Sequence, residues 1–346
     1  MPVTKIEEPS PPTSPWLARV ESWLWAKPEF RMVPDLVIPF GPEEPPSTPP
    51  PDLPRVGFVG FPSDFSLAIL LGLLRAGVQL AGIATSLGAN PVIAGQNALS
   101  QVADHLGVPL LRLARVNDYD SVVALQRLRA KMFVVASFDQ IMGQKVLHIP
   151  PLGFVNVHPS LLPQYRGPEP IYWAIVKGET ESGVSFQKVA PEIDAGPLLA
   201  QERAPILPTD TAGTLTRRVT EAGALRLPDV VRRALASDQG EAMDMTTGSY
   251  FTSVGHRRID LVESALLADR LVRAGNPNML AAAQCGGHTC YVIKVRRITA
   301  SDPSPGPRLH YPDGDILVEE TIDRCGCHHG EPIGSCPHDE VPAGIA

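Results

Sequence analysis

The chain has 346 residues, of which 44% are hydrophobic, and its formal net charge is −7. This length is enough for roughly two domains. The acidic balance argues against DNA as a partner and limits any contact with RNA to a local basic patch, because nucleic-acid binding depends on cations that neutralise phosphates. Five cysteines, an odd number, occur without a secretory signal or an apolar run long enough to cross a bilayer. We therefore expect a soluble cytoplasmic protein without a disulfide scaffold or a membrane span.

Residues 1–54 form a proline-rich leader that ends in the run GPEEPPSTPPPDLP. Proline fixes the backbone torsion φ and lacks an N–H group, so such a run favours extended chain without helices. We expect this leader to be partly disordered. Its three tryptophans, Trp16, Trp23 and Trp25, are large enough to dock and order a part of it on a neighbouring surface.

From Arg55 onward, apolar runs typical of buried strands alternate with segments of helical spacing. The predicted strands are RVGFVGF, QLAGIATS, VPLLRL and KMFVVAS, and the predicted helices between them are SDFSLAILLGLLRAGV, NALSQVADHLG and SVVALQRLRA. This alternation predicts an α/β fold over residues 55–245, a doubly wound, Rossmann-like parallel sheet. Such sheets bind ligands at the carboxyl ends of their strands, here in the loops after Gly60, Ser86 and Ala136. The first loop lacks a GxGxxG motif, which argues against a standard dinucleotide site.

A second, smaller domain is expected over residues 250–325. The segment HRRIDLVESALLADRLVRAG predicts a helix that ends near Gly275, and TCYVIKVRRITA and GDILVEE predict strands of a β-rich unit. Residues 326–346 form a tail with few apolar side chains.

The segment FVNVH, residues 154–158, carries two side chains suited to chemistry. Side chains alternate between the faces of a strand, so Asn156 and His158 share one face, and Pro159 limits continuation of the strand. A neutral amide can donate a hydrogen bond to an oxygen that gains negative charge, and a histidine can move a proton near neutral pH. A nearby carboxylate would orient the histidine, and Asp194 is our first candidate, with Glu192 as the second. Spacing alone is equally consistent with a structural role for these residues.

The wider motif resembles the folate-dependent formyltransferase family. It consists of NVHPSLLPQYRG followed by ESGVSF and PEIDAGPLL, and the resemblance runs from about Arg55 to Ala236, including DTAGTLTRRVTEAGALRLPDVV. The family includes methionyl-tRNA, sugar-nucleotide and phosphoribosylglycinamide formyltransferases. The resemblance implies an enzyme that transfers a formyl group from 10-formyltetrahydrofolate to a primary amine.

The resemblance also implies roles for individual residues. Asn156 matches the asparagine that binds the formyl oxygen, His158 the histidine that stabilises the reaction intermediate, and Asp194 the aspartate that pairs with that histidine and helps to deprotonate the amine. The family binds its folate against two loops, largely through backbone groups, and the matching residues here are Phe138, Asp139, Gln140, Ile141, Met142, Ala190, Pro191, Glu192, Ile193 and Gly196. The matching substrate-binding residues are Ser160, Leu161, Leu162, Arg166 and Gly167.

The sequence indicates the amine acceptor less specifically than it indicates the reaction. The segment from residue 256 resembles the start of the C-terminal domain in methionyl-tRNA and sugar-nucleotide formyltransferases, which the purine-pathway enzyme lacks. In methionyl-tRNA formyltransferases a basic insertion after the second strand contacts the acceptor stem, but TSLGANPVIAGQNALSQ here contains no Lys or Arg. We expect methionyl-tRNA as the acceptor, with an amino-sugar nucleotide or another small amine as the alternative. A folate-binding relative without transferase activity is a further alternative. The candidates for a basic patch are Arg257, Arg258, Lys294, Arg296 and Arg297.

The tail contains CGCHHGEPIGSCPH, which supplies thiol and imidazole groups suited to zinc. Its four candidate ligands for a structural zinc ion are Cys325, Cys327, Cys336 and His338. Their spacing is not that of a common zinc finger, so a flexible tail is the alternative.

Overall fold

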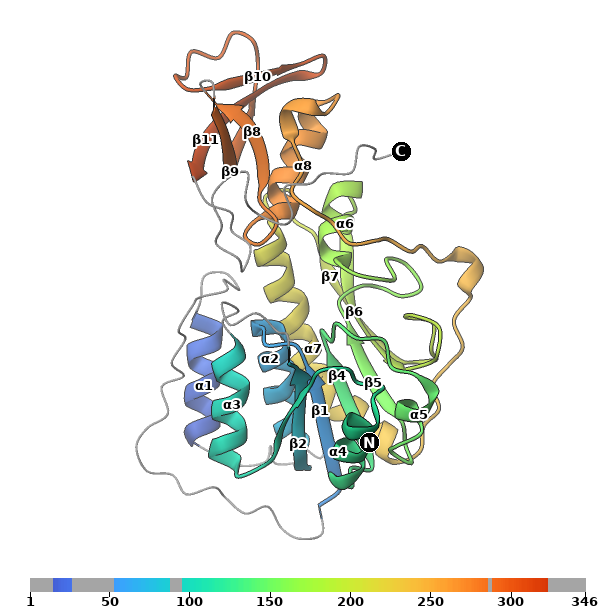
Figure 1. The fold of residues 1–346 in the computed structure, drawn as a ribbon. Coiled ribbons are helices and arrows are strands. Elements are labelled where there is room, and N and C mark those ends of the chain that lie inside the picture. Colours follow the sequence, from blue (N-terminus) through green and yellow to red (C-terminus); the bar gives the residue numbers. More distant parts are fainter. Residues whose placement is uncertain (1–14, 27–52, 88–94, 286–287, 323–346) are drawn as a thin grey trace, which may run out of the picture.

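The computed structural model describes residues 15–26, 53–87, 95–285 and 288–322 (Figure 1). Its larger unit is built on a seven-stranded sheet of order β3-β2-β1-β4-β5-β6-β7. The first five strands in this order are parallel to their neighbours. This architecture confirms the predicted doubly wound α/β fold. The strands are β1 (Arg55–Gly60), β2 (Gln79–Ser86), β3 (Leu110–Leu113), β4 (Met132–Ala136), β5 (Phe154–His158), β6 (Glu181–Lys188) and β7 (Leu198–Pro205).

The last two strands depart from the parallel pattern, because β6 pairs antiparallel with both β5 and β7. A parallel neighbour needs a crossover of a dozen or more residues, and the short connection between β6 and β7 is too brief for one. The result is a mixed sheet whose antiparallel edge brings β6 directly beside β5 and its polar side chains.

Helices cover both faces of this sheet, as its apolar strands require. One face packs against α2 (Asp64–Leu74), α3 (Gly95–Leu106) and α7 (Ala212–Leu235), and the other against α4 (Tyr119–Arg127) and α5 (Gln144–Leu147). Helix α2 is buried along almost its whole length, because α7 and α1 also pack against it. This burial explains why its sequence is apolar on every side. Helix α6 (Pro170–Lys177) follows β5.

Helix α1 (Pro15–Ala26) lies within the segment expected to be a leader, next to α2 and α3 (Figure 1). Its Val20 and Leu24 are fully buried, and the ring of Trp16 stacks on His105 with 4.2 Å between the ring centroids. Glu21 forms an ion pair with Arg75, the residue that follows the end of α2. A short helix in water is marginal by itself, so these contacts stabilise it. The rest of residues 1–54, apart from residues 53 and 54, lies outside the described residues.

The C-terminal unit is a four-stranded antiparallel sheet of order β10-β11-β9-β8, with α8 (Ala265–Gly275) beside it (Figure 1). Its strands are β8 (Ala281–Cys285), β9 (His288–Ile298), β10 (Arg308–Tyr311) and β11 (Gly314–Ile322). The predicted smaller β-rich domain is thereby confirmed. Cys290 of β9 is disulfide-bonded, a covalent link that the cysteine count did not lead us to expect.

The predicted helix over residues 256–275 begins only at Ala265. Ser264 supplies the reason, because its hydroxyl accepts a hydrogen bond from the backbone N–H of Leu267 and so caps the helix. The preceding chain forms a short 3-10 turn, Ile259–Leu261, and another such turn, Met245–Thr247, lies in the connection from α7.

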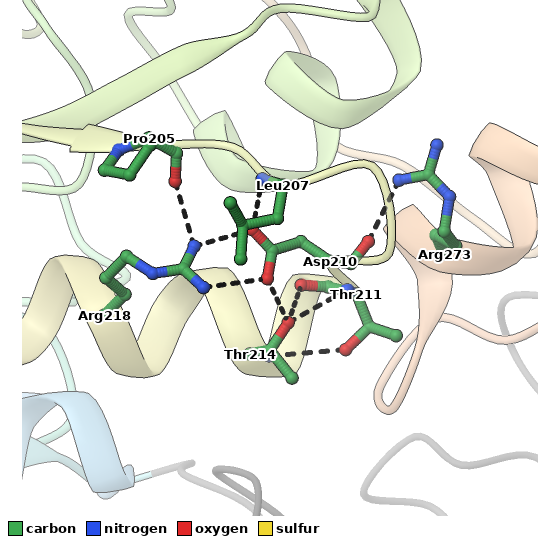
Figure 2. A network of polar contacts seen from close by, with 7 residues as sticks. All are labelled: Pro205, Leu207, Asp210, Thr211, Thr214, Arg218 and Arg273. Carbon is green, nitrogen blue, oxygen red and sulfur yellow. Dashed lines mark hydrogen bonds and ion pairs between the residues drawn. The ribbon is translucent and has the colours of Figure 1, made fainter.

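A network around Asp210 joins the two units at the start of α7 (Figure 2). The carboxylate of Asp210 accepts hydrogen bonds from the guanidinium of Arg218 at 2.6 and 3.0 Å and from the hydroxyl of Thr214 at 2.9 Å. Its backbone carbonyl accepts a hydrogen bond of 2.9 Å from Arg273 of α8. Asp210 is buried, so the network fixes the first turn of α7 against the end of α8.

Asp210→Asn is expected to lower the free energy of unfolding by about 2 kcal/mol near neutral pH, because hydrogen bonds to a charged group are lost. Burial by itself raises the pKa of Asp210, but the hydrogen bonds from Arg218, Leu207 and Thr214 outweigh it and hold the pKa below its ordinary value of 3.8. A depressed carboxyl pKa stabilises the fold above pH 3.8, and this contribution is lost as the pH falls through the folded-state pKa. Urea unfolding at a series of pH values should show that the unfolding free energies of the wild type and of Asp210→Asn approach each other as the pH falls below 3.8.

Asp229→Asn is the control, because Asp229 lies on α7, the helix that Asp210 precedes, and pairs with Arg226 and Arg232 at the surface. Surface ion pairs contribute about 0–1 kcal/mol, so this variant should unfold almost like the wild type. If both variants lost the same free energy of unfolding, the Asp210 network would stabilise the fold no more than a surface ion pair does.

Candidate active site

A cleft of about 870 Å³ opens at the carboxyl ends of β1, β4 and β5, where Phe61, Ser137 and His158 line it. Its volume lies in the range of small-molecule sites. The loops after Gly60 and Ala136 line the cleft as the fold predicts. Of the loop after Ser86, residues 88–94 lie outside the described residues.

Strand β5 places the two polar side chains of FVNVH on the cleft. Asn156 and His158 line it, while Val155 and Val157 join the apolar core beneath the helices, and Val157 also borders the cleft. The expected alternation is therefore present. The next residue, Pro159, follows the end of the strand.

Asp194 lies beside this pair although it is far away in sequence. Its Oδ1 atom accepts hydrogen bonds from the amides of Asn156, at 3.3 Å, and Gln187, at 2.8 Å. Its Oδ2 atom accepts one from the backbone N–H of Gly167, at 3.0 Å, and lies 3.6 Å from Nδ1 of His158. The backbone of Asp194 has a φ of 51°, in the left-handed region, so surrounding contacts must hold it there.

The second candidate carboxylate, Glu192, lies elsewhere. Its Oε1 atom pairs with the guanidinium of Arg166 at 3.0 Å, and its side chain is 71% exposed. The structure therefore brings Asp194, and not Glu192, to His158.

His158 is buried and is held at both ring nitrogens. Its Nε2 lies 2.9 Å from the backbone carbonyl of Tyr165, to which it donates when it carries the proton. Its Nδ1 faces Asp194. When the ring is protonated, both nitrogens can donate, and the positive charge then lies at the floor of the cleft next to Asn156.

The predicted folate-binding loop after β4 forms one wall of the cleft, which Phe138, Asp139, Gln140, Ile141 and Met142 all line. Two of these side chains anchor the loop to the protein. Asp139 accepts a hydrogen bond from the hydroxyl of Ser86, and Gln140 donates to the carbonyl of Leu113 at 3.2 Å and accepts from the N–H of Val116 at 2.6 Å. Apolar groups of Phe138, Ile141 and Met142 thus complete the wall.

The other predicted folate-binding loop, residues 190–196, follows β6. Ala190, Pro191 and Ile193 line the cleft, whereas Glu192 and Gly196 do not. A Cβ atom on Gly196 would lie 1.7 Å from the carbonyl oxygen of Lys188. Glycine is therefore required there, and the loop passes directly over the end of β6.

The predicted substrate-binding residues divide into two groups. Gly167 lines the cleft with its backbone, while Ser160, Leu161, Leu162 and Arg166 do not line it. Ser160 and Leu162 are buried, and the hydroxyl of Ser185 on β6 accepts a hydrogen bond from the N–H of Leu162 at 3.0 Å. These residues thus support the turn that carries Gly167.

A second wall of the cleft was not anticipated from the sequence. It comprises the start of α7, part of the connection from α7 to α8, the end of α8 and the residues that follow α8. Its residues are Ala212, Gly213, Thr216, Tyr250, Ser253, Ala274, Gly275, Asn278 and Met279. Tyr172 of α6 also lines the cleft, and burial raises its pKa, so the phenol is neutral. Such widely separated segments carry no local motif, and only the packing of α7 on α8 reveals the wall.

Four of the five basic side chains considered for a nucleic-acid patch lie next to acidic side chains. Arg258 pairs with Asp260, Lys294 and Arg296 both pair with Glu319, and Arg297 approaches Asp313 at 4.0 Å. Their charges are thus partly neutralised within the C-terminal unit.

Two further expectations concern metal and membrane. In the described ranges, no group of three or more metal-ligating side chains occurs, and the candidate zinc ligands Cys325, Cys327, Cys336 and His338 lie outside those ranges. The same described residues contain no helix with the length and apolar character needed to cross a membrane.

Comparisons with known proteins agree with this architecture. A family model for formyl transferases matches residues 88–231. The methionyl-tRNA formyltransferase of Roseiflexus castenholzii is 33% identical over 290 residues, which cover 79% of this chain and 92% of that protein.

Two solved structures share the fold. A sugar N-formyltransferase from a Shewanella species is 20% identical, with a TM-score of 0.54 over 69% of this chain and 96% of its own. The N-formyltransferase of Helicobacter canadensis, solved with folinic acid and dTDP-3-aminofucose, is 15% identical, with a TM-score of 0.54 over 78% of this chain and 100% of its own. These structures show the fold, and the sequence relatives show that the chain belongs to the formyl transferase family and is an enzyme that transfers formyl groups.

Proposed function

We propose that the protein transfers the formyl group of 10-formyltetrahydrofolate to a primary amine, and that Asn156, His158 and Asp194 carry out the transfer. The observation that carries this proposal is the position of the Asp194 carboxylate. It lies against both Asn156 and His158 at the floor of the cleft. The three side chains supply a hydrogen-bond donor, a chargeable ring and a proton acceptor around one point.

The lining of the cleft supports a folate donor. Phe138 and Met142 of one loop and Ile193 of the other line it, and such apolar side chains can pack against the faces of a flat ring system. Backbone groups of the same loops can bind the polar edge of such a ring. The folate supplies the formyl carbon, which is bound to one of its nitrogen atoms.

The residues divide the chemistry between them. Asn156 uses an N–H of its amide to stabilise the formyl oxygen as the acceptor amine bonds to the formyl carbon. Asp194 accepts the proton that the amine loses, and His158, when protonated, adds its charge close to the same oxygen. The bond from carbon to the folate nitrogen then breaks, and that nitrogen receives the proton, so the products are the formamide and tetrahydrofolate.

Methionyl-tRNA is the acceptor that the names of the sequence relatives support. A small amine, such as an amino-sugar nucleotide, is the second candidate, because Arg258, Lys294 and Arg296 are paired with acidic side chains. A polyanion would have to compete for these cations. Both acceptors are consistent with a cytoplasmic enzyme.

One experiment separates these possibilities. The protein is incubated with 10-formyltetrahydrofolate and, in separate reactions, charged initiator tRNA or a panel of amino-sugar nucleotides, and the product masses are measured. A formylated methionyl-tRNA supports the first acceptor, and a formylated sugar the second. Folate binding without any formylated product would instead support a non-catalytic relative and refute the proposal.

A structural zinc ion held by Cys325, Cys327, Cys336 and His338 remains a separate proposal, without a role in formyl transfer. Metal analysis of protein purified without a histidine tag tests it. Protein without stoichiometric zinc would exclude it.

A further inference from the structure

Gln187 lies on β6 directly across from Asn156 of β5, as the register of the two strands shows. Its side chain is 2% exposed and lines the cleft. The amide is used at both ends: Oε1 accepts a hydrogen bond from the backbone N–H of Gly196 at 3.1 Å, and Nε2 donates to Oδ1 of Asp194 at 2.8 Å. Gln187 therefore links β6 to Asp194 and to Gly196, two residues further along the same turn.

Two amides share Oδ1 of Asp194, but they do so unequally. The hydrogen bond from Gln187 is 2.8 Å long, and that from Asn156 is 3.3 Å long. Gln187 cannot turn away without losing Gly196 as well, whereas no second side-chain partner holds Asn156 among the contacts of the described residues. The Gln187 bond is thus the fixed one and the Asn156 bond the exchangeable one.

We propose that Gln187 is a positioning residue for formyl transfer. It holds the carboxylate of Asp194 in place, so that Asn156 can turn its N–H groups to the formyl oxygen without leaving a buried carboxylate oxygen unsatisfied, which is costly. This inference rests on the proposed function of Asn156 and Asp194.

The backbone of the turn shows why the two hydrogen bonds of Gln187 are needed to hold it. Asp194 has a left-handed φ of 51°, which is unfavourable for a residue with a side chain. Gly196 passes so close to the carbonyl of Lys188 that the turn has little freedom on that side. Gln187 restrains the turn through Oδ1 of Asp194, the oxygen that Asn156 also contacts.

Gln187→Met tests the role, because methionine has a similar volume but lacks both hydrogen bonds. We expect kcat to fall about 10- to 100-fold, since small displacements of reacting groups have effects of this size. The KM for 10-formyltetrahydrofolate should change less than about threefold, because the folate walls are untouched. Steady-state kinetics with saturating acceptor measures both quantities.

Lys188→Met is the matched control. Lys188 is the next residue of the same strand, and its ammonium donates to the carbonyl of Leu152 at 2.9 Å, away from Asp194. The change of Lys188 to methionine removes a hydrogen bond at the end of β6 but leaves the hydrogen bonds of Gln187 to Asp194 and Gly196 in place. Its kcat should stay within about threefold of the wild type.

Gln187→Glu adds a readout that a merely structural residue would not change. Its new carboxyl group lies against Asp194, and two carboxyl groups at hydrogen-bond distance share one proton. The other charged groups around them are His158 on β5 and the Glu192–Arg166 pair beside the turn. As the pH is lowered, the shared proton restores a donor, so the activity of this variant relative to the wild type should rise.

The outcomes separate this inference from the proposed function. A wild-type protein without transferase activity would refute the proposed function. An active wild type whose Gln187→Met variant keeps its kcat, or loses no more than Lys188→Met, would overturn the role of Gln187. A Gln187→Glu variant whose relative activity does not depend on pH would also overturn it.

Discussion

The Asp194→Asn enzyme is expected to fold normally and to lose about three orders of magnitude in kcat. Asparagine has nearly the same shape, and its oxygen can still accept the hydrogen bond of Gln187. It cannot accept a proton from the amine, however, and it carries no charge opposite His158. The removed carboxylate is the one that four neighbouring groups surround in the cleft.

Rates under saturating donor and acceptor, together with thermal unfolding, measure this effect. Glu192→Gln is the comparison, because Glu192 lies on the same turn but pairs with Arg166 at the surface. We expect the kcat of Glu192→Gln to fall at most about tenfold, because the substitution shifts the turn only slightly. If kcat fell equally in both variants, the rate would depend on the total charge of the turn and not on the position of the Asp194 carboxylate.

Asn156→Ala is expected to lower kcat by about 10²- to 10³-fold, the usual effect of removing one donor to a developing oxyanion. Asn156 is the amide side chain of β5, where it bonds to Asp194 and shares the cleft with His158, and alanine leaves no donor at its place. Because the residue lines the cleft rather than the core, the free energy of unfolding should change little.

Val155→Ala makes the opposite change one residue earlier on the same strand. Val155 is fully buried in the core beneath the helices and does not line the cleft. We expect this variant to lose about 2 kcal/mol of stability and to keep most of its kcat. If Asn156→Ala lost stability and kept its activity, Asn156 would be a structural residue of the strand.

The parts of the fold that follow from local patterns were predictable from the sequence. The alternation in FVNVH placed Asn156 and His158 on one face of a strand, and the alternating strands and helices from Arg55 indicated the doubly wound sheet. These features depend on side-chain periodicity, which is visible within a few residues.

Features that depend on packing over long distances were not predictable in this way. Gln187 reaches the site because β6 runs antiparallel to β5, and no local pattern specifies the direction of pairing. The wall formed by α7 and α8 depends on contacts of Asp210 with Arg273 and of Gly213 with Asn276. The pairing of Lys294 and Arg296 with Glu319 likewise requires two strands to lie side by side.

The most direct test of the central claim follows the formyl carbon itself. The donor 10-formyltetrahydrofolate is labelled with ¹³C in its formyl group, and the label is traced by mass in the amine acceptor while released tetrahydrofolate is counted. The wild type should place one labelled formyl group on the amine for each tetrahydrofolate released, and Asp194→Asn should do so about a thousandfold more slowly. Release of tetrahydrofolate with labelled formate in place of a labelled formamide, or equal transfer by both proteins, would contradict the account.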